Sequence, residues 1–175
     1  AYRIVPLADD GSPVPNAAPV EIDLTALEAP NTFVQVIGLV PSQGGGRFWL
    51  VWQRQQVVSG TSFTDLRVRG HDADGRPATA VLTLPMAGGF LGTTTFGTRP
   101  DDSLLLAWTE SQGGTPANTQ ALVGADGQVR WTSSQPGTGL PGPCCLFPLA
   151  DGTGTWLAWR VDTGSNGFAA YGVRL

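Results

Sequence analysis

The chain has 175 residues, of which 41% are hydrophobic and only 14% are charged, and its net charge is −4. Its 24 glycines and 14 prolines are scattered between apolar runs without a fixed period, which excludes collagen and argues against a disordered chain. All 10 basic residues are arginines and they form no cluster, so the sequence predicts no nucleic-acid partner. It also predicts no membrane insertion, because no apolar run approaches the roughly 20 residues that a membrane span needs.

The scarcity of charge bears on where the protein acts. A surface covered by Gly, Ser, Thr, Gln and Asn is more typical of exported proteins than of cytosolic ones. The sequence begins with Ala1, which agrees with a mature protein after removal of a signal peptide, or with a processed fragment. We therefore expect a secreted or cell-surface protein.

Residues 1–30 contain two short apolar runs on either side of a turn at Asp10–Gly11. Their pattern is that of the outer two strands of a four-stranded unit whose inner strands are absent. Residues 21–29 are compatible with a short helix, a loop or an edge strand. Beyond this region helical periodicity is nearly absent.

An apolar strand that ends in tryptophan then recurs three times. It reads FWLVW at 48–52, LLLAW at 104–108 and TWLAW at 155–159, roughly fifty residues apart, which is the spacing of a structural repeat. Each copy is preceded by an apolar run and a turn, and is followed by a polar loop and a further strand. Short runs rich in Val, Leu, Thr, Phe and Trp favour β-strands. The sequence therefore predicts an all-β chain.

Both faces of these tryptophan strands are apolar, so each strand needs cover on both sides. Neighbouring propeller blades or the two layers of a sandwich would provide it. Because Trp52, Trp108 and Trp159 recur at one position, we expect them to pack between sheets. Trp49 and Trp156 are expected to pack on the opposite face.

Aspartate–glycine pairs separate several of the strand runs. They occur at 10–11, 74–75, 126–127 and 151–152. Such pairs predict tight hairpin turns in which the glycine has a positive φ.

The strands divide the chain into related units. We expect closing strands of a half-blade at 1–30, a first unit at 31–85, a second at 86–140 and an incomplete third at 141–175. The shared pattern of strand, ADG turn, tryptophan strand, loop and DADG turn resembles the degenerate blade repeats of secreted bacterial β-propellers. The segment LVGADGQVRW at 122–131 is also similar to a corner of the PQQ-like propeller repeat. The resemblance implies a β-propeller or partial propeller of about three to four four-stranded antiparallel blades, and it carries over no functional residue.

This number of units is small, since closed propellers have about four to eight blades. Three alternatives remain open: two copies that complete each other, a small irregular ring closed by its own ends, or a fragment or a sandwich. An exposed strand edge is a template for another chain. We therefore expect self-association through unpaired strand edges at both termini.

The residues available for catalysis are few. His71 is the only histidine, and no G-x-S-x-G elbow is present to position a nucleophilic serine. The acids Asp65, Asp101, Asp102 and Glu110 are expected in turns or at strand ends, where they are solvated. We expect no catalytic residue, no cofactor and no enzyme activity.

Two further groups of residues suggest sites of other kinds. Asp72 and Asp74 begin like a calcium loop, but the later ligands of such a loop are missing, so a hairpin turn explains them better. Cys144 and Cys145 are adjacent, and in an exported protein they either form a vicinal disulfide or point to opposite faces of a strand and stay reduced. No other metal site is expected.

Ligand contacts are expected in the polar segments that follow the tryptophan strands, which would gather on one rim of a propeller. The candidates are Trp131, Gln53, Gln56, Asn118 and Asn166. Trp131 stands alone in an outer strand and could present its indole to a sugar ring. These patterns favour a non-catalytic protein with a structural, self-assembling or partner-binding role. A carbohydrate-binding propeller is the alternative, and a fragment of a larger propeller enzyme is the third reading.

Overall fold

A computed structural model describes the chain at residues 2–5, 12–16, 18–30, 32–43, 46–86, 91–112, 115–136, 143–148, 155–162 and 168–174. Within these ranges the fold is all-β, as the sequence predicts. Their single helical element is a 3-10 turn, η1 (Thr25–Leu27).

The strands form antiparallel sheets in which consecutive strands are neighbours. The first sheet pairs β1 (Tyr2–Ile4) with β2 (Val20–Ile22). The second contains β3 (Thr32–Pro41), β4 (Arg47–Val58), β5 (Thr61–Asp72) and β6 (Leu82–Pro85). The third contains β7 (Leu91–Thr98), β8 (Leu104–Gln112), β9 (Thr115–Val123) and β10 (Val129–Pro136). The fourth contains β11 (Pro143–Pro148), β12 (Thr155–Asp162) and β13 (Phe168–Arg174), and none of the described sheets closes on itself.

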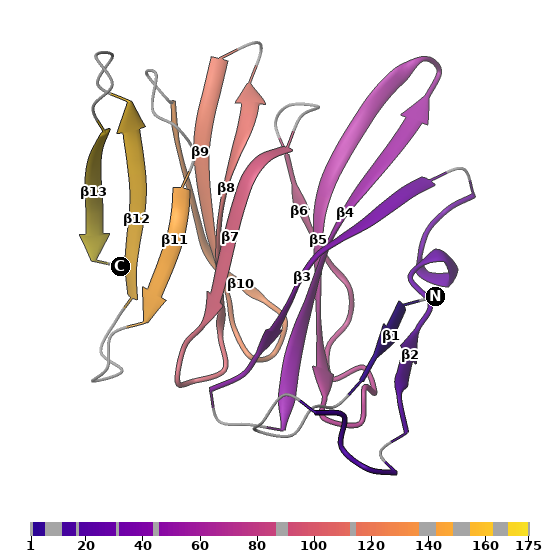
Figure 1. The fold of residues 1–175 in the computed structure, drawn as a ribbon. Helices are drawn as coiled ribbons and strands as arrows, with labels where there is room; N and C mark the ends of the chain where they lie inside the picture. The colour runs from indigo at the N-terminus through magenta and orange to yellow at the C-terminus, as the bar shows by residue number, and fades with distance from the viewer. Residues whose placement is uncertain are drawn as a thin grey trace.

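The sheets follow one another in chain order across Figure 1, from indigo β1–β2 to yellow β11–β13, and they stand face to face. Their first strands come close together: Cα atoms of β3 and β7, and of β7 and β11, lie within 8 Å of each other. The last strands, β6 and β10, do not approach to the same extent in the described ranges. The sheets therefore converge at their first strands.

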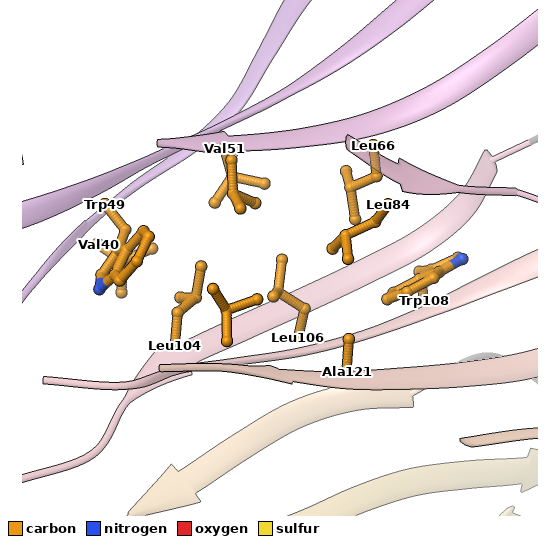
Figure 2. Close-up of a cluster of buried hydrophobic side chains, with 11 residues drawn as sticks. Val40, Trp49, Val51, Leu66, Leu84, Leu104, Leu106, Trp108 and Ala121 are labelled. Carbon is orange, nitrogen blue, oxygen red and sulfur yellow. The ribbon is translucent and has the colours of Figure 1, made fainter. Parts of the chain in front are cut away.

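Side chains alternate between the two faces of β4, and both faces are buried. One face packs on the first sheet and η1 in a cluster that contains Ile22, Leu24, Phe48, Leu50 and Trp52. The other face packs on the third sheet in the apolar cluster of Figure 2. That cluster includes Trp49, Val51, Leu66, Leu84, Leu104, Leu106 and Trp108. Because both faces of β4 are buried there, residues 48–52 form a continuous apolar run and do not alternate between apolar and polar.

Trp52 and Trp108 occupy the same place in consecutive sheets, since each packs toward the preceding sheet. They are 0% and 1% exposed, which confirms that these two tryptophans belong to the core. Trp49 is buried on the opposite face of β4, as expected. Trp156 and Trp159 lie in β12, whose side chains are outside the described part of the structure.

The second and third sheets are joined where β3 meets β7. A Cβ atom on Gly38 would overlap the ring of Phe96, so glycine is required for this close approach. Nearby, the hydroxyl of Thr98 donates a 2.8 Å hydrogen bond to the carbonyl of Pro41. The indole of Trp49 donates a 3.0 Å hydrogen bond to the carbonyl of Asp102. These contacts fix how the two sheets face each other.

The turn predictions are confirmed where the structure describes them. Gly75 and Gly127 both have a φ of +79°, which is the left-handed conformation that glycine adopts without strain. The pairs at 10–11 and 151–152 lie outside the described residues.

The expected loops after the tryptophan strands are wrong in two places. Residues 53–56 belong to β4, which continues to Val58, and of the expected loop at 111–118, residues 111–112 belong to β8 and residues 115–118 to β9. Glu110 lies within β8 and is buried, although it was expected to be solvated. Polar residues in these segments resemble a loop in the sequence. In the structure they pair with the next strand and extend both hairpins past the apolar core.

Candidate functional site

The two equivalent tryptophans, Trp52 and Trp108, are each surrounded by polar side chains at the end of the apolar core. In the second sheet, Trp52 pairs across strands with Arg67, and in the third sheet Trp108 pairs with Thr119. Arg54 follows Trp52 by two residues as Glu110 follows Trp108, so each pair of residues lies on one face. The strand arrangement around the tryptophan is therefore the same in both sheets. The polar side chains beside the indole differ in charge between the two sheets.

Other side chains of this protein surround the indole of Trp52 and bind its N–H group. Its indole N–H donates a 3.0 Å hydrogen bond to Oε1 of Glu28, which comes from the segment after η1. Nη1 of Arg67 lies 3.3 Å from the same oxygen, and Nε of Arg54 lies 4.0 Å from Oε2. Arg54 also pairs with Asp65 on the neighbouring strand. This buried network holds the N-terminal segment against the second sheet.

Trp108 is equally buried, but its polar surroundings differ. A pocket of about 200 Å³ lies beside it, lined by Leu84, Trp108, Glu110, Thr119 and residues 132–134. The indole nitrogen of Trp108 is buried and has no hydrogen-bond partner among the described residues. In Figure 2 this nitrogen points away from the apolar cluster.

Two hydroxyl groups in the pocket wall are linked to Glu110 by hydrogen bonds. The hydroxyl of Thr119 donates a 2.5 Å hydrogen bond to Oε1 of Glu110, whose residue is 4% exposed. Oγ of Ser134 lies 2.9 Å from Oγ1 of Thr119. Because Thr119 has only one hydroxyl proton, Ser134 acts as the donor in the second bond. The pocket wall thus combines the buried Trp108 side chain with two hydroxyls and a carboxyl group.

The ligand candidates expected from the sequence do not gather at this pocket. Trp131 is 36% exposed and pairs with Leu122, which places it on the opposite face of the third sheet. Asn118 lies on that same face, paired with Gln135, well away from Trp131 along the strand. Its Oδ1 is buried and has no partner among the described residues.

Gln53 and Gln56 point to opposite faces of β4, because they are three positions apart and side chains alternate along a strand. Gln53 lines a second depression of about 340 Å³ together with Gln35, Gly92 and Thr94. Asn166 lies outside the described residues. The predicted rim therefore does not form one site in the described part of the chain.

The HDADG segment forms a turn. Nδ1 of His71 lies 2.9 Å from the carbonyl of Gly75, and its ring stacks on Phe48 with centroids 5.1 Å apart. Burial lowers the pKa of His71 below its ordinary value of 6.5. Oδ1 of Asp72 accepts a 2.7 Å hydrogen bond from the backbone N–H of Arg76, which closes the turn.

Asp72, Asp74, Cys144 and Cys145 are the remaining residues for which the sequence suggests a site. Among the described residues there is no group of three or more His, Cys, Asp or Glu side chains that could hold a metal ion. Asp74 is exposed on the turn. Cys144 and Cys145 lie in β11, where the pairing with β12 shifts register between Pro143 and Cys145, but their side chains are outside the described part. Their disulfide remains a prediction.

Glu28 and Glu110 are the polar residues that sequence reasoning missed. Glu28 was part of a segment without a clear structural pattern, and Glu110 was expected to be solvated. A charged residue two positions after a buried strand tryptophan is the signal that could have indicated Glu110, since it falls on the same buried face. No equivalent signal connects Glu28 with Trp52, because the two are joined only by tertiary packing.

These features define an all-β protein made of consecutive antiparallel sheets packed face to face. Comparison with protein-family models, curated proteins and solved structures finds no match for this chain. In the described ranges no helix combines the length and apolar character needed to cross a membrane.

Proposed function

We propose that this chain is a propeller-type repeat protein with a non-catalytic role in binding partners, including other copies of itself. The observation that carries the proposal is the stacking of four-stranded meanders whose first strands converge, as the inner strands of propeller blades do. The burial of Trp52 and Trp108 against the preceding sheet supports it, because each sheet then depends on a neighbour for its core.

The fourth sheet supports a role in association. In the described ranges it has three strands where the second and third sheets have four, and β13 lies at one of its edges. The first sheet pairs two described strands, so β1 and β2 each have an edge without a described neighbour. An edge strand presents unpaired backbone N–H and C=O groups to which another strand can add. In the proposed oligomer, β13 of one copy forms backbone hydrogen bonds with a strand of the first sheet of a second copy.

Light scattering on the full chain over a range of concentrations tests this proposal. We expect a discrete oligomer that dissociates on dilution. A synthetic peptide of residues 1–22 should compete for the edge of β13 and shift the mass toward the monomer. The same peptide with Ile4→Pro and Ile22→Pro is the matched control, since proline cannot donate a backbone hydrogen bond. A chain that is monomeric at every concentration would contradict the proposal.

Carbohydrate binding at Trp131 is a second candidate function. Its support is the partial exposure of the indole, which is 36% exposed on edge strand β10. Exposed aromatic faces stack on apolar ligand surfaces while their N–H groups stay accessible. A glycan array with the wild-type chain and Trp131→Ala tests it, and equal signals from the two proteins would remove it.

A further inference from the structure

A polar pocket lies between the second and third sheets, where β3 and β7 separate. The two strands meet at the contact of Gly38 with Phe96, and Figure 1 shows them diverging from there toward their first residues. Between them lies a pocket of about 340 Å³, lined by Gln35, Val36, Ile37, Gln53, Gly92 and Thr94. Its volume falls within the range of roughly 300–1,000 Å³ that is usual for small-molecule sites.

Both strands are irregular beside this pocket. The pairing of β3 with β4 shifts register between Val36 and Gly38, and the pairing of β7 with β8 shifts between Leu91 and Thr94. A β-bulge bends its strand and increases the local twist, and such bulges are frequent next to functional sites. Because a register shift lies on each side of the pocket, its shape depends on the backbones of two paired strands and not on a single loop.

Two carboxamide side chains line the pocket from neighbouring strands. Gln35 and Gln53 are directly paired, so they lie on one face of the second sheet, the face on which Val51 packs toward the third sheet. Gln35 is exposed and Gln53 is half-buried, so both side chains are accessible. Neither carboxamide has a hydrogen-bond partner among the described residues, whereas the next glutamine on this face, Gln55, donates a 2.9 Å hydrogen bond to Oγ of Ser62.

The lining residues restrict the chemistry of a ligand. None of the described lining residues is charged, so a charged ligand would lose hydration without gaining a counter-ion. An apolar ligand would displace water from the two carboxamides without replacing its hydrogen bonds. Each carboxamide has an acceptor oxygen and an NH₂ donor group, so two adjacent carboxamides match neighbouring hydroxyl groups, which also donate and accept.

The size of the pocket suits a single sugar ring. At about 30 Å³ per water molecule, the pocket corresponds to on the order of ten waters, which is similar to the number of non-hydrogen atoms in a hexose. Its lining is mainly polar, which agrees with a ligand that carries hydroxyl groups on most of its carbon atoms.

We infer that this pocket binds a neutral sugar ring, whose neighbouring hydroxyl groups form hydrogen bonds with the carboxamides of Gln35 and Gln53. The site is separate from Trp131, which lies on the face of the third sheet opposite to Trp108. It is also independent of the proposed self-association, because it lies between two sheets and uses no strand edge of β13 or of the first sheet.

Nuclear magnetic resonance on the isotope-labelled full chain tests the inference directly, because each glutamine side chain gives its own pair of NH₂ signals. Gln35→Glu and Gln53→Glu identify the two pairs by loss. The probes are D-glucose, D-galactose, D-mannose and N-acetyl-D-glucosamine, and D-glucuronate and protonated D-glucosamine are charged comparators built on the same ring. We expect at least one neutral sugar to shift both pairs saturably, and we expect both comparators to bind at least about tenfold more weakly.

Matched variants separate this pocket from other sites. Gln35→Ala and Gln53→Ala should each weaken sugar binding about threefold to tenfold, as expected for the loss of one hydrogen bond. Gln56→Ala is the control, because Gln56 lies on the opposite face of β4, and it should leave binding unchanged, as should Trp131→Ala. Backbone amide signals outside the pocket should be the same in all variants, which shows that each of them is folded.

Three results would overturn the inference. The first is that no neutral sugar shifts the Gln35 and Gln53 signals saturably. The second is that a charged comparator binds as tightly as its neutral counterpart. The third is that Gln56→Ala weakens binding as much as Gln53→Ala does.

Discussion

The indole N–H of Trp52 donates a 3.0 Å hydrogen bond to Oε1 of Glu28, although 24 positions separate the two residues in the chain. Glu28 has a side chain that is 2% exposed, and it is also paired with Arg67. A buried carboxylate with these partners ties the N-terminal segment to the second sheet.

We expect Glu28→Ala to lower the free energy of unfolding by about 2–3 kcal/mol, since it removes a charged hydrogen-bond partner and leaves Arg67 without its counter-ion. Urea denaturation measures the effect. Glu21→Ala is the control, because Glu21 is exposed on β2 and its loss should change stability by less than about 0.5 kcal/mol. Equal effects of the two substitutions would show that the Glu28 network contributes nothing.

Replacing each equivalent tryptophan by phenylalanine should have unequal effects. Both changes remove the same part of a buried ring, but Trp52→Phe also removes a hydrogen bond and leaves Oε1 of Glu28 with Arg67 as its remaining partner. Trp108→Phe removes an N–H that has no partner among the described residues. In the absence of ligand, we expect Trp52→Phe to be more destabilising by about 1–2 kcal/mol in denaturant unfolding. The opposite order would contradict the structure of these two sites.

Gly38→Ala should disturb the junction of the second and third sheets. The new methyl group would overlap the ring of Phe96, so we expect a loss of about 1–3 kcal/mol in the free energy of unfolding. Combining it with Phe96→Leu should recover part of this loss, because the smaller side chain makes room. A double-mutant cycle measures the coupling. Strictly additive effects would mean that β3 and β7 do not approach each other here.

The sequence was sufficient to predict the strand-rich architecture, the burial of Trp52 and Trp108, and the positive φ of Gly75 and Gly127. These features follow from local patterns: apolar runs, repeat spacing and turn residues. The continuation of β4 and β8 beyond the tryptophans could not be predicted in this way. The polar residues there form strands only because they pair with the next strand and pack beside the adjacent sheet.

The candidate site was harder to predict for a related reason. Trp52 and Trp108 end similar sequence motifs, so their strands read alike. Their environments differ because Glu28 enters from outside the repeat at one position and a pocket lies at the other. Ligand candidates chosen for their place after a tryptophan strand were distributed over both faces of the sheets by strand alternation.

Stability should fall in mildly acidic solution because of His71. Burial lowers the pKa of His71, so the folded state resists protonation while the unfolded chain binds a proton near its ordinary pKa of 6.5. Stability is therefore full above pH 6.5 and is lost as the pH falls below it, until the lowered pKa of the folded state is reached.

This pH window is separate from that of the carboxyl groups. Hydrogen bonds from Thr25 and Ser103 lower the pKa values of Asp23 and Asp101 below 3.8, so their contribution is lost only in more acidic solution. His71→Gln should flatten the stability profile just below pH 6.5 and leave the more acidic part unchanged. Thermal unfolding across this range measures it. A wild-type profile that is already flat there would show that His71 is protonated equally well in the folded state.

The central claim is that the edge of β13 pairs with the first sheet of another copy. Amide hydrogen exchange of β13 in dilute and concentrated solutions of the full chain tests it most directly, because an added strand protects outward-facing backbone N–H groups. We predict that protection of β13 rises with concentration in parallel with the native mass. Exchange of β13 that is equally fast at all concentrations would contradict the claim.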